Sequence, residues 1–214
     1  MGIRAITTVQ TPASGYDLTT LAVVKDELSI TDTSKDTTLS RYITSASAAI
    51  AQYCNRVFPS ETVKDEFWPD RETYGFQLPG SMMSLQLTRW PVGTVTSVTE
   101  NGTALVDGTD YRVDKDNGSL IRLGGNAYPT TWLAWPIVAI YAGGFAAIPS
   151  DIADAAVRMV KARYLAKGRD PYLKQENIPG VRDYSLWVPT GDEAGNMPPD
   201  VADLLDNYRA VIVV

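Results

Sequence analysis

Hydrophobic residues near the start of the chain recur at the spacing of helices. A short helix is predicted after Asp17, which can cap it, because the next apolar residues lie three or four positions apart on one face. The polar loop SITDTSKDTT then leads into a longer helix with the same spacing. The apolar positions of the two helices are Leu18, Leu21, Val24 and Leu28, and then Leu39, Ile43, Ala46, Ile50, Tyr53 and Val57.

From about residue 60 the pattern changes to the alternation typical of strands. The stretches MSLQLTRWPVGTVTSVTENGTAL and DYRVDKDNGSLIRL carry β-branched and apolar residues at period two. Within them, Asn101-Gly102 and Asn117-Gly118 are predicted hairpin turns. The run WPIVAIYAGGF is almost continuously apolar, which predicts a strand buried on both faces. We therefore expect an antiparallel β module inserted between helices.

A corner joins that last strand to a third helix within IVAIYAGGFAAIPSDIADAA. Its predicted structural residues are Gly143, Gly144, Phe145 and Pro149. Glycine permits positive φ, whereas proline fixes φ and lacks a donor, so these residue types favour an abrupt change of direction. Ser150 is the predicted N-cap of the helix, and its charges change from acidic to basic along its length, as the helix dipole favours. The predicted apolar stripe is Ile152, Ala156, Met159, Val160 and Tyr164, with Gly168 as the stop.

The C-terminal part of the chain lacks periodicity until close to its end. The stretch LKQENIPGVRDYSLWVPTGDEAGNMPP is punctuated by proline and glycine, which in a compact domain is typical of a segment that moves or binds. Pro198-Pro199-Asp200 opens a last short helix, and the apolar end can add a strand to a neighbour's sheet. We predict that this arm docks on a partner; the alternative is a flexible tail with a packed terminal strand. The predicted contact residues are Tyr184, Leu186, Trp187, Tyr208, Val211, Ile212, Val213 and Val214.

Together these patterns predict an α+β fold with a mainly helical core, an inserted antiparallel β module and an extended C-terminal arm. The predicted divisions are an N-terminal segment (1–16), the first part of the helical core (17–58), the β module (59–147), the second part of the core (148–169) and the arm with a short C-terminal helix and apolar tail (170–214).

Composition and charge narrow the class of protein. Of the 214 residues, 44% are hydrophobic, which is ordinary for a folded globule. A formal net charge of −6 argues against a broad surface that grips phosphate backbones. Cys54 is the single cysteine, so no intramolecular disulfide can form and a reducing compartment is expected. No apolar run reaches the roughly 20 residues that span a bilayer, and the start lacks a signal-peptide pattern, so we expect a protein made in a cytoplasm with no membrane partner.

The residue types leave little room for catalysis. The chain has no histidine, which excludes histidine-based triads and the commonest metal ligand. Asp114 begins a stretch resembling a calcium loop, but its glycine falls at the fifth position and Gly125 stands at the twelfth. The glycine pairs lack the motifs of phosphate-binding loops, and Cys54 fits a core position better than a nucleophile. The basic end of the third helix suits a solvated surface better than a nucleic-acid site. We therefore predict no catalytic, cofactor-binding or metal-binding residues.

The order of these elements resembles that of the head-to-tail connector (adaptor) proteins of tailed bacteriophages and of related gene-transfer particles. The stretch LTTLAVVKDELSITDTSKDTTLSRYITSASAAIAQYCNR matches the opening helices of that family. LQLTRWPVGTVTSV is similar to the start of its β module, and VAIYAGGFAAIPSDIADAAVRMVKARY to the strand, glycine-aromatic corner, proline and helix that follow. The resemblance covers roughly residues 17–167, and the chain from Asp170 departs from the shared pattern.

The resemblance implies a structural, non-enzymatic virion protein of the neck, at the head-tail interface. Copies would form a ring that binds the portal protein and joins the capsid to the tail. In this family the ring is commonly a dodecamer. Stopper or tail proteins would be further partners, and DNA would pass through the lumen without sequence-specific binding. An acidic subunit suits a channel that must not hold its cargo. The glycine corner would return the chain from the β module to the helical core.

Two other functions stay open on the sequence alone. One is a tail-completion or stopper protein of the neck, which would contact the tail tube rather than the portal. The other, from a different class, is an acidic hydrolase or a carbohydrate-binding module that uses the tryptophans of the β region. Those tryptophans are Trp68, Trp90, Trp132 and Trp135.

Overall fold

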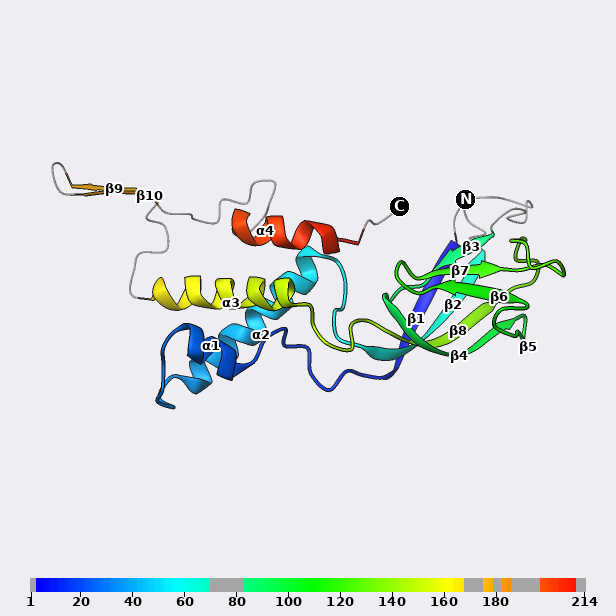
Figure 1. Cartoon of the computed structure of the whole chain (residues 1–214), viewed down its shortest axis with the longest axis horizontal. Coiled ribbons are helices and arrows are strands. Elements are labelled where there is room, and N and C mark those ends of the chain that lie inside the picture. Colours follow the sequence, from blue (N-terminus) through cyan, green and yellow to red (C-terminus); the bar gives the residue numbers. More distant parts are fainter. Residues whose placement is uncertain (1–2, 70–82, 168–174, 179–181, 186–196, 211–214) are drawn as a thin grey trace. The chain divides into compact units, whose positions relative to one another are not determined.

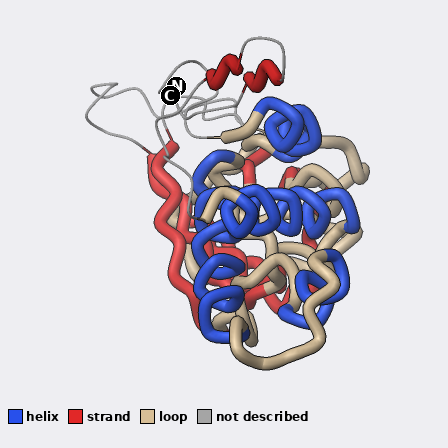
Figure 2. The backbone as a smooth tube through the Cα atoms, turned by 90° about the vertical axis from the view of Figure 1, so that its left-hand side faces the viewer, coloured by secondary structure: helices blue, strands red, loops and turns tan. Residues whose placement is uncertain are grey.

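The computed structural model describes residues 3–69, 83–167, 175–178, 182–185 and 197–210. The chain divides into two compact units (Figure 1), and Figure 2 shows their helices in blue and their strands in red. Met1–Gly15 and Val57–Ala147 form what we call the β unit, and Tyr16–Arg56 and Ile148–Val214 form the helical unit. The α+β class is confirmed, but helices and strands take about equal shares of the described residues, so the expectation of a mainly helical fold is only loosely met.

The β unit contains two antiparallel sheets. Five strands follow the order β1-β2-β8-β4-β5, and a smaller sheet has the order β3-β7-β6. Their bounds are β1 Ile3–Thr11, β2 Glu61–Pro69, β3 Ser84–Gln86, β4 Val92–Glu100, β5 Thr103–Ala104, β6 Tyr111–Asp114, β7 Ser119–Arg122 and β8 Ile137–Gly143. Both predicted hairpin turns are confirmed, since Asn101-Gly102 joins β4 to β5 and Asn117-Gly118 lies between β6 and β7.

The first strand was not predicted from the sequence. Ile3–Thr11 alternates weakly between apolar and polar residues, and only its pairing with β2 identifies it as a strand. It forms one edge of the five-stranded sheet, with most of its side chains exposed. Strand pairing between distant segments is decided by tertiary structure, which a local pattern does not report.

Strand β8 lies between β2 and β4, where a buried apolar strand was expected. The structure corrects that expectation, because the strand buries one face and covers the other only in part. Ile137, Ala139 and Tyr141 are buried in the core, whereas the residues between them are only partly buried. The sheet is antiparallel, and such sheets commonly cover one face and leave the other toward solvent.

The helical unit consists of α1 (Leu21–Glu27), α2 (Asp36–Tyr53), α3 (Ser150–Leu165) and α4 (Pro199–Leu205), followed by a short 3-10 turn at Asp206–Tyr208. Helix α3 contacts each of the other three, with α1 and α4 on its opposite sides (Figure 1). One core cluster joins α1, α2 and α3, and its buried members are Val24, Leu39, Tyr42, Ile43, Ala46, Val157 and Val160. The predicted helical spacing therefore located the faces that pack.

Two predicted helix caps are wrong. Thr20, not Asp17, caps α1, and its hydroxyl accepts a hydrogen bond from the Val23 N–H. Ser150 is the first residue of α3 rather than its cap, because Pro149 holds the extended backbone that precedes the helix. Proline has a fixed φ, and the Pro149 φ of −55° agrees with it, so Pro149 takes the capping position and the helix begins at Ser150 itself. The predicted stop at Gly168 lies outside the described residues.

The C-terminal arm contains structure that the sequence pattern did not predict. Gln175–Ile178 (β9) and Arg182–Ser185 (β10) pair as an antiparallel hairpin. The short helix expected after Pro198 is confirmed as α4.

Candidate functional site: the strand-to-helix corner and two charged surfaces

The two glycines of the corner are required by close backbone contacts. A Cβ atom on Gly143 would lie 2.5 Å from the Arg89 Cβ and 2.7 Å from the Arg89 carbonyl oxygen. A Cβ on Gly144 would lie 2.6 Å from the Pro59 carbonyl oxygen, and the Gly144 φ of +107° is one that other residues rarely adopt. Both positions therefore exclude any larger residue.

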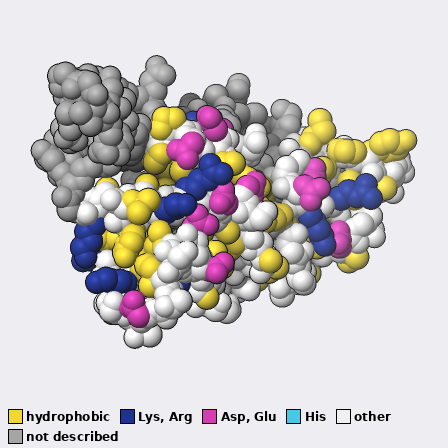
Figure 3. Space-filling model, turned by 60° about the vertical axis from the view of Figure 1, so that its left-hand side comes forward, with side chains coloured by type: hydrophobic (Ala, Val, Ile, Leu, Met, Phe, Trp, Pro, Cys, Tyr) yellow, Lys and Arg dark blue, Asp and Glu magenta, His cyan; other side chains and the backbone are white. Residues whose placement is uncertain are grey.

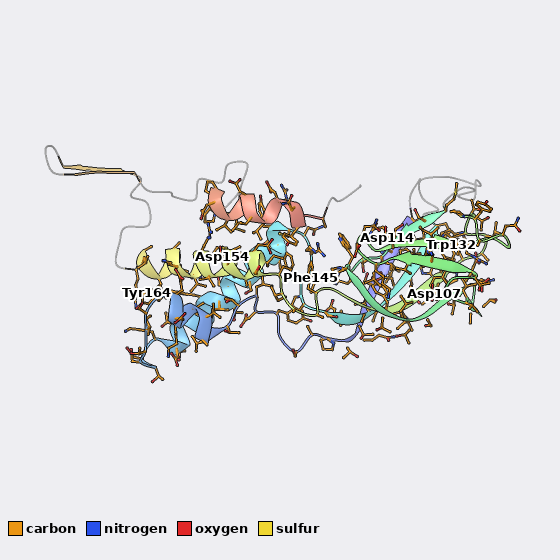
Figure 4. All side chains as sticks on the ribbon, viewed as in Figure 1. Asp107, Asp114, Trp132, Phe145, Asp154 and Tyr164 are labelled. Carbon is orange, nitrogen blue, oxygen red and sulfur yellow. The ribbon has the colours of Figure 1, made fainter. Side chains whose placement is uncertain are left out.

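Phe145 ties the corner to the segment before β2 (Figure 4). Its N–H donates to the Phe58 carbonyl at 2.7 Å, and its own carbonyl accepts from the Ser60 N–H at 3.1 Å. The Phe58 and Phe145 rings stack with centroids 6.3 Å apart. These backbone hydrogen bonds and the aromatic pair hold the chain where it leaves β8, at the corner for which the sequence predicted a structural role.

A buried polar network in the β unit lies next to the corner. The Asp65 carboxylate, fully buried in β2, accepts hydrogen bonds from the Tyr141 hydroxyl at 2.6 Å and from the Thr88 N–H at 2.9 Å. The Thr88 hydroxyl also donates to Asp65 at 2.8 Å and accepts from Thr7 at 2.9 Å. Burial and the neighbouring Asp65 charge raise the pKa of Tyr141, so it stays a neutral donor.

An ion pair extends this network to the corner. The Arg89 Nε donates to the Glu61 carboxylate at 2.9 Å, and the Glu61 side chain is only 2% exposed. Arg89 also gives its backbone N–H to the Tyr141 hydroxyl. The residue pattern alone did not identify Glu61 and Asp65. The available signal was their position, since both share the inward face of β2 with Val63 and Phe67, where a charge must have partners.

Neither the network nor Cys54 has the features of a catalytic centre. Burial raises the pKa of the Cys54 thiol to about 11, so its reactive thiolate is scarce at neutral pH. The thiol lies 3.9 Å from the Leu205 carbonyl oxygen within the helical unit. Among the residues that the structure describes, no three or more acidic, cysteine or histidine side chains group together as a metal site. The hydrogen bonds of the network join strands of the β unit, and the helical unit presents two charged surfaces, which are described next.

The first charged surface, which we call the guanidinium pair, consists of Arg41 and Arg163 around Tyr42. The Arg163 guanidinium lies 4.4 Å from the centroid of the Tyr42 ring, and that of Arg41 lies 5.6 Å from it. Arg163 also donates to the Ser45 hydroxyl at 3.0 Å. Within the described part of the chain, neither arginine has a carboxylate partner.

The second surface, which we call the acidic stripe, is the exposed side of α4 and the turn after it. Asp200, Asp203 and Asp206 follow one another at intervals of three residues and are all exposed. Asp200 lies 3.5 Å from Arg158, and Asp206 lies 3.8 Å from Arg209. Asp206 also accepts a hydrogen bond from the Tyr53 hydroxyl at 2.9 Å, whereas Asp203 has no ion pair among the described residues. Exposed ion pairs such as these contribute little stability.

The predicted contact residues of the arm are only partly described. Tyr208 lies in the turn after α4, where its hydroxyl donates to Asp151 at 2.7 Å. Tyr184 belongs to β10. The other predicted residues, Leu186, Trp187 and Val211 to Val214, lie outside the described residues. Of the corner residues, Gly143, Gly144 and Phe145 come together with Phe58 and Pro59, and Pro149 precedes α3.

The tryptophans of the β unit divide between core and surface. Trp132 is 2% exposed, whereas Trp68 is 42% exposed. Trp90 and Trp135 pack, partly buried, against the core. A shallow open hollow of about 540 Å³ beside β7 is lined by Arg122, Gly124, Leu133 and neighbouring loop residues. It contains none of these tryptophans, so it does not match the aromatic sugar-binding surface considered from the sequence.

A family model matches the chain over residues 18–77, and it describes phage gp6-like head-tail connector proteins. This match confirms the resemblance inferred from the sequence for the part of the chain that holds α1, α2 and β2. No curated protein matches the chain. None of the described helices has the length and hydrophobicity to cross a membrane.

Solved structures with a similar fold come from gene transfer agent (GTA) particles. A chain from the neck of the empty GTA particle, computed with C6 symmetry, is 19% identical with a TM-score of 0.55. A chain from the neck of the native particle, computed with C12 symmetry, is 20% identical with a TM-score of 0.55. A chain from the virion of the native particle is 19% identical with a TM-score of 0.56. Each match covers 98% of this chain and 97% of the other chain, and shows a shared fold.

Proposed function

We propose that this protein is a structural head-tail adaptor of a tailed phage or gene-transfer particle. Copies form a ring in the particle neck, bind the portal protein and join the capsid to the tail, while DNA passes through the lumen. The observation that carries the proposal is the agreement of two comparisons, a connector family over residues 18–77 and a neck-protein fold over 98% of the chain.

The structural features fit a mechanical role. The corner is held by backbone contacts and the stacked Phe58 and Phe145 rings, and Asp65 and Glu61 are buried with hydrogen-bonding partners. Such a network fixes one arrangement of the β unit, which an assembly subunit needs in order to present the same surface in every copy. The C-terminal arm, with Trp187 as an anchor, is proposed to dock on the portal or an adjacent copy.

Removal of the gene tests the proposal directly. Without the protein, we expect assembly to stop at heads that lack tails. In the complete particle, we expect electron cryomicroscopy to show a ring of this protein next to the portal. Heads with normally attached tails in the absence of the protein would contradict the proposal.

The proposed adaptor catalyses no reaction, and substitution of Cys54 tests this. Replacement of Cys54 by serine is expected to leave particle assembly intact, at a cost in unfolding free energy of about 1 kcal/mol from the altered buried contact. Loss of a measurable turnover in a folded Cys54→Ser variant would reopen an enzymatic function. Infectious or gene-transferring particles with the serine variant would support a purely structural role.

A further inference from the structure

The helical unit carries opposite charges on two separate surfaces. The guanidinium pair lies where α2 and the end of α3 meet, around Tyr42. The acidic stripe lies on α4, which contacts α3 through a different part of its surface, near Arg158 and Asp151. Figure 1 shows α4 on the side of α3 that is opposite to α1, and Figure 3 shows basic and acidic side chains both exposed on the face in view.

Among the described residues, the guanidinium pair has no carboxylate partner. Two arginines are held near the same ring, so their charges repel, and no described carboxylate compensates either of them. Two lysines of the unit differ from these arginines, since Lys25 pairs with Asp36 and Lys161 with Glu27. Planar guanidinium groups favour carboxylates, which they can bind with two parallel hydrogen bonds.

We propose that neighbouring copies contact each other through these surfaces, with the guanidinium pair of one copy against the acidic stripe of the next. This inference rests on the ring described under the proposed function. A closed ring is built from heterologous contacts, in which two different surfaces of each subunit meet, so it requires two complementary surfaces that lie apart on the same subunit. Arg41 and Arg163 provide one, and Asp203, exposed and without an ion pair among the described residues, is the centre of the other.

Nucleic acid is the less favourable partner for the guanidinium pair. A protein that binds a phosphate backbone usually presents an extended basic surface. Here the chain carries a net charge of −6, and Asp36 and Glu27 neutralise the lysines on the neighbouring helix α1 and on α3. To bind an acidic protein surface, the two arginines of the guanidinium pair are enough. A second copy of this chain presents such an acidic surface, the acidic stripe.

Chemical cross-linking in assembled particles tests the contact while keeping every charge. Ala48 lies on the exposed side of α2, and Asn207 lies beside the acidic stripe. A full-length variant with Ala48→Cys, Asn207→Cys and Cys54→Ser is incorporated into particles and treated with a short bismaleimide. We expect a ladder of covalent oligomers that grows by one subunit at a time. Each single-cysteine variant is the control, and it should give no ladder.

Charge reversal provides the second measurement. Arg41→Glu and Asp203→Arg are each expected to reduce the protein in purified particles about tenfold, and the combined variant to recover most of the loss. Lys115→Asp, an exposed charge change in the β unit, is the matched control and should have no effect. Circular dichroism confirms that each variant is folded.

The outcomes separate this inference from the proposed function. A ring in the neck with no cross-linked ladder, or no recovery by the combined variant, overturns the contact but keeps the adaptor role. Absence of the protein from the neck overturns both. Tight binding of a fluorescent DNA duplex that Arg41→Glu abolishes, together with no ladder, would assign the guanidinium pair to nucleic acid instead.

Discussion

At the scale of single residues, Gly144 is constrained by its backbone conformation and by its close neighbours. Its φ is +107°, and an added Cβ would lie 2.6 Å from the Pro59 carbonyl oxygen. We predict that Gly144→Ala lowers the free energy of unfolding by about 2 kcal/mol or more, because strain and a backbone clash add together. Thermal or urea denaturation measures it. Gly125→Ala is the matched control, since nothing lies within 4 Å of its added Cβ; equal losses in the two variants would contradict the strain argument.

Tyr208 gives a prediction that depends on pH. The hydrogen bond to Asp151, then burial and the Asp151 charge, raise the pKa of Tyr208 to about 12, above the ordinary value of 10.0. Its contribution to stability is therefore complete below about pH 10 and is lost as the pH rises through about 12. Tyr208→Phe should lower the free energy of unfolding by about 1 kcal/mol at pH 7.

The difference between Tyr208→Phe and the wild-type protein should shrink across that alkaline range. Urea denaturation at a series of pH values measures it. Tyr128→Phe serves as the control, because Tyr128 is 75% exposed and its hydroxyl makes no hydrogen bond among the described residues. A difference that stays constant up to about pH 12 and beyond would show that the Asp151 contact does not raise the pKa of Tyr208.

At the scale of elements, the C-terminal arm can be tested by truncation. Cutting after Tyr208 would also remove contacts within the helical unit, because Arg209 lies over the Tyr53 ring and the Ala210 N–H donates to the Cys54 carbonyl. A cut after Ala210 keeps these contacts and removes only Val211 to Val214. We predict that the shortened protein folds but binds the portal at least about tenfold more weakly, as expected if an added strand is lost.

Binding to purified portal, measured by biolayer interferometry, checks this prediction. Circular dichroism and the melting temperature control for folding. Full affinity and complete particles with the shortened protein would mean that the terminal residues form no docking strand. Trp187→Ala, tested in the full chain, separates the anchor from the strand.

At the scale of the whole molecule, we predict that the purified protein is monomeric or weakly associated and becomes ordered as a ring only on the portal. The sequence has no sustained heptad pattern that would specify a strong preformed oligomer. Contacts between exposed charges, such as the guanidinium pair and the acidic stripe, are weak individually and screened by salt. Light scattering measures the mass in solution, and a stable dimer retained in the particle would contradict the ring.

The sequence by itself determined the elements whose pattern is local. Helical spacing located α2 and α3 and most of their buried residues, and the Asn-Gly pairs located two hairpin turns. The sequence also placed a glycine at position 144, where a φ of +107° limits the residue types that the position accepts. These features depend on residues close together in the chain, so a single sequence contains the information.

Only the tertiary structure decided what distant residues do to one another. Strand β1 exists through its pairing with β2, and β8 buries one face while the other is only partly buried. Asp65 and Glu61 became network residues once folding brought Thr88, Arg89 and Tyr141 beside them. The guanidinium pair likewise needs α2 and α3 to meet at Tyr42. Such contacts join residues far apart in sequence, and their energies depend on burial and geometry that arise only when the chain folds.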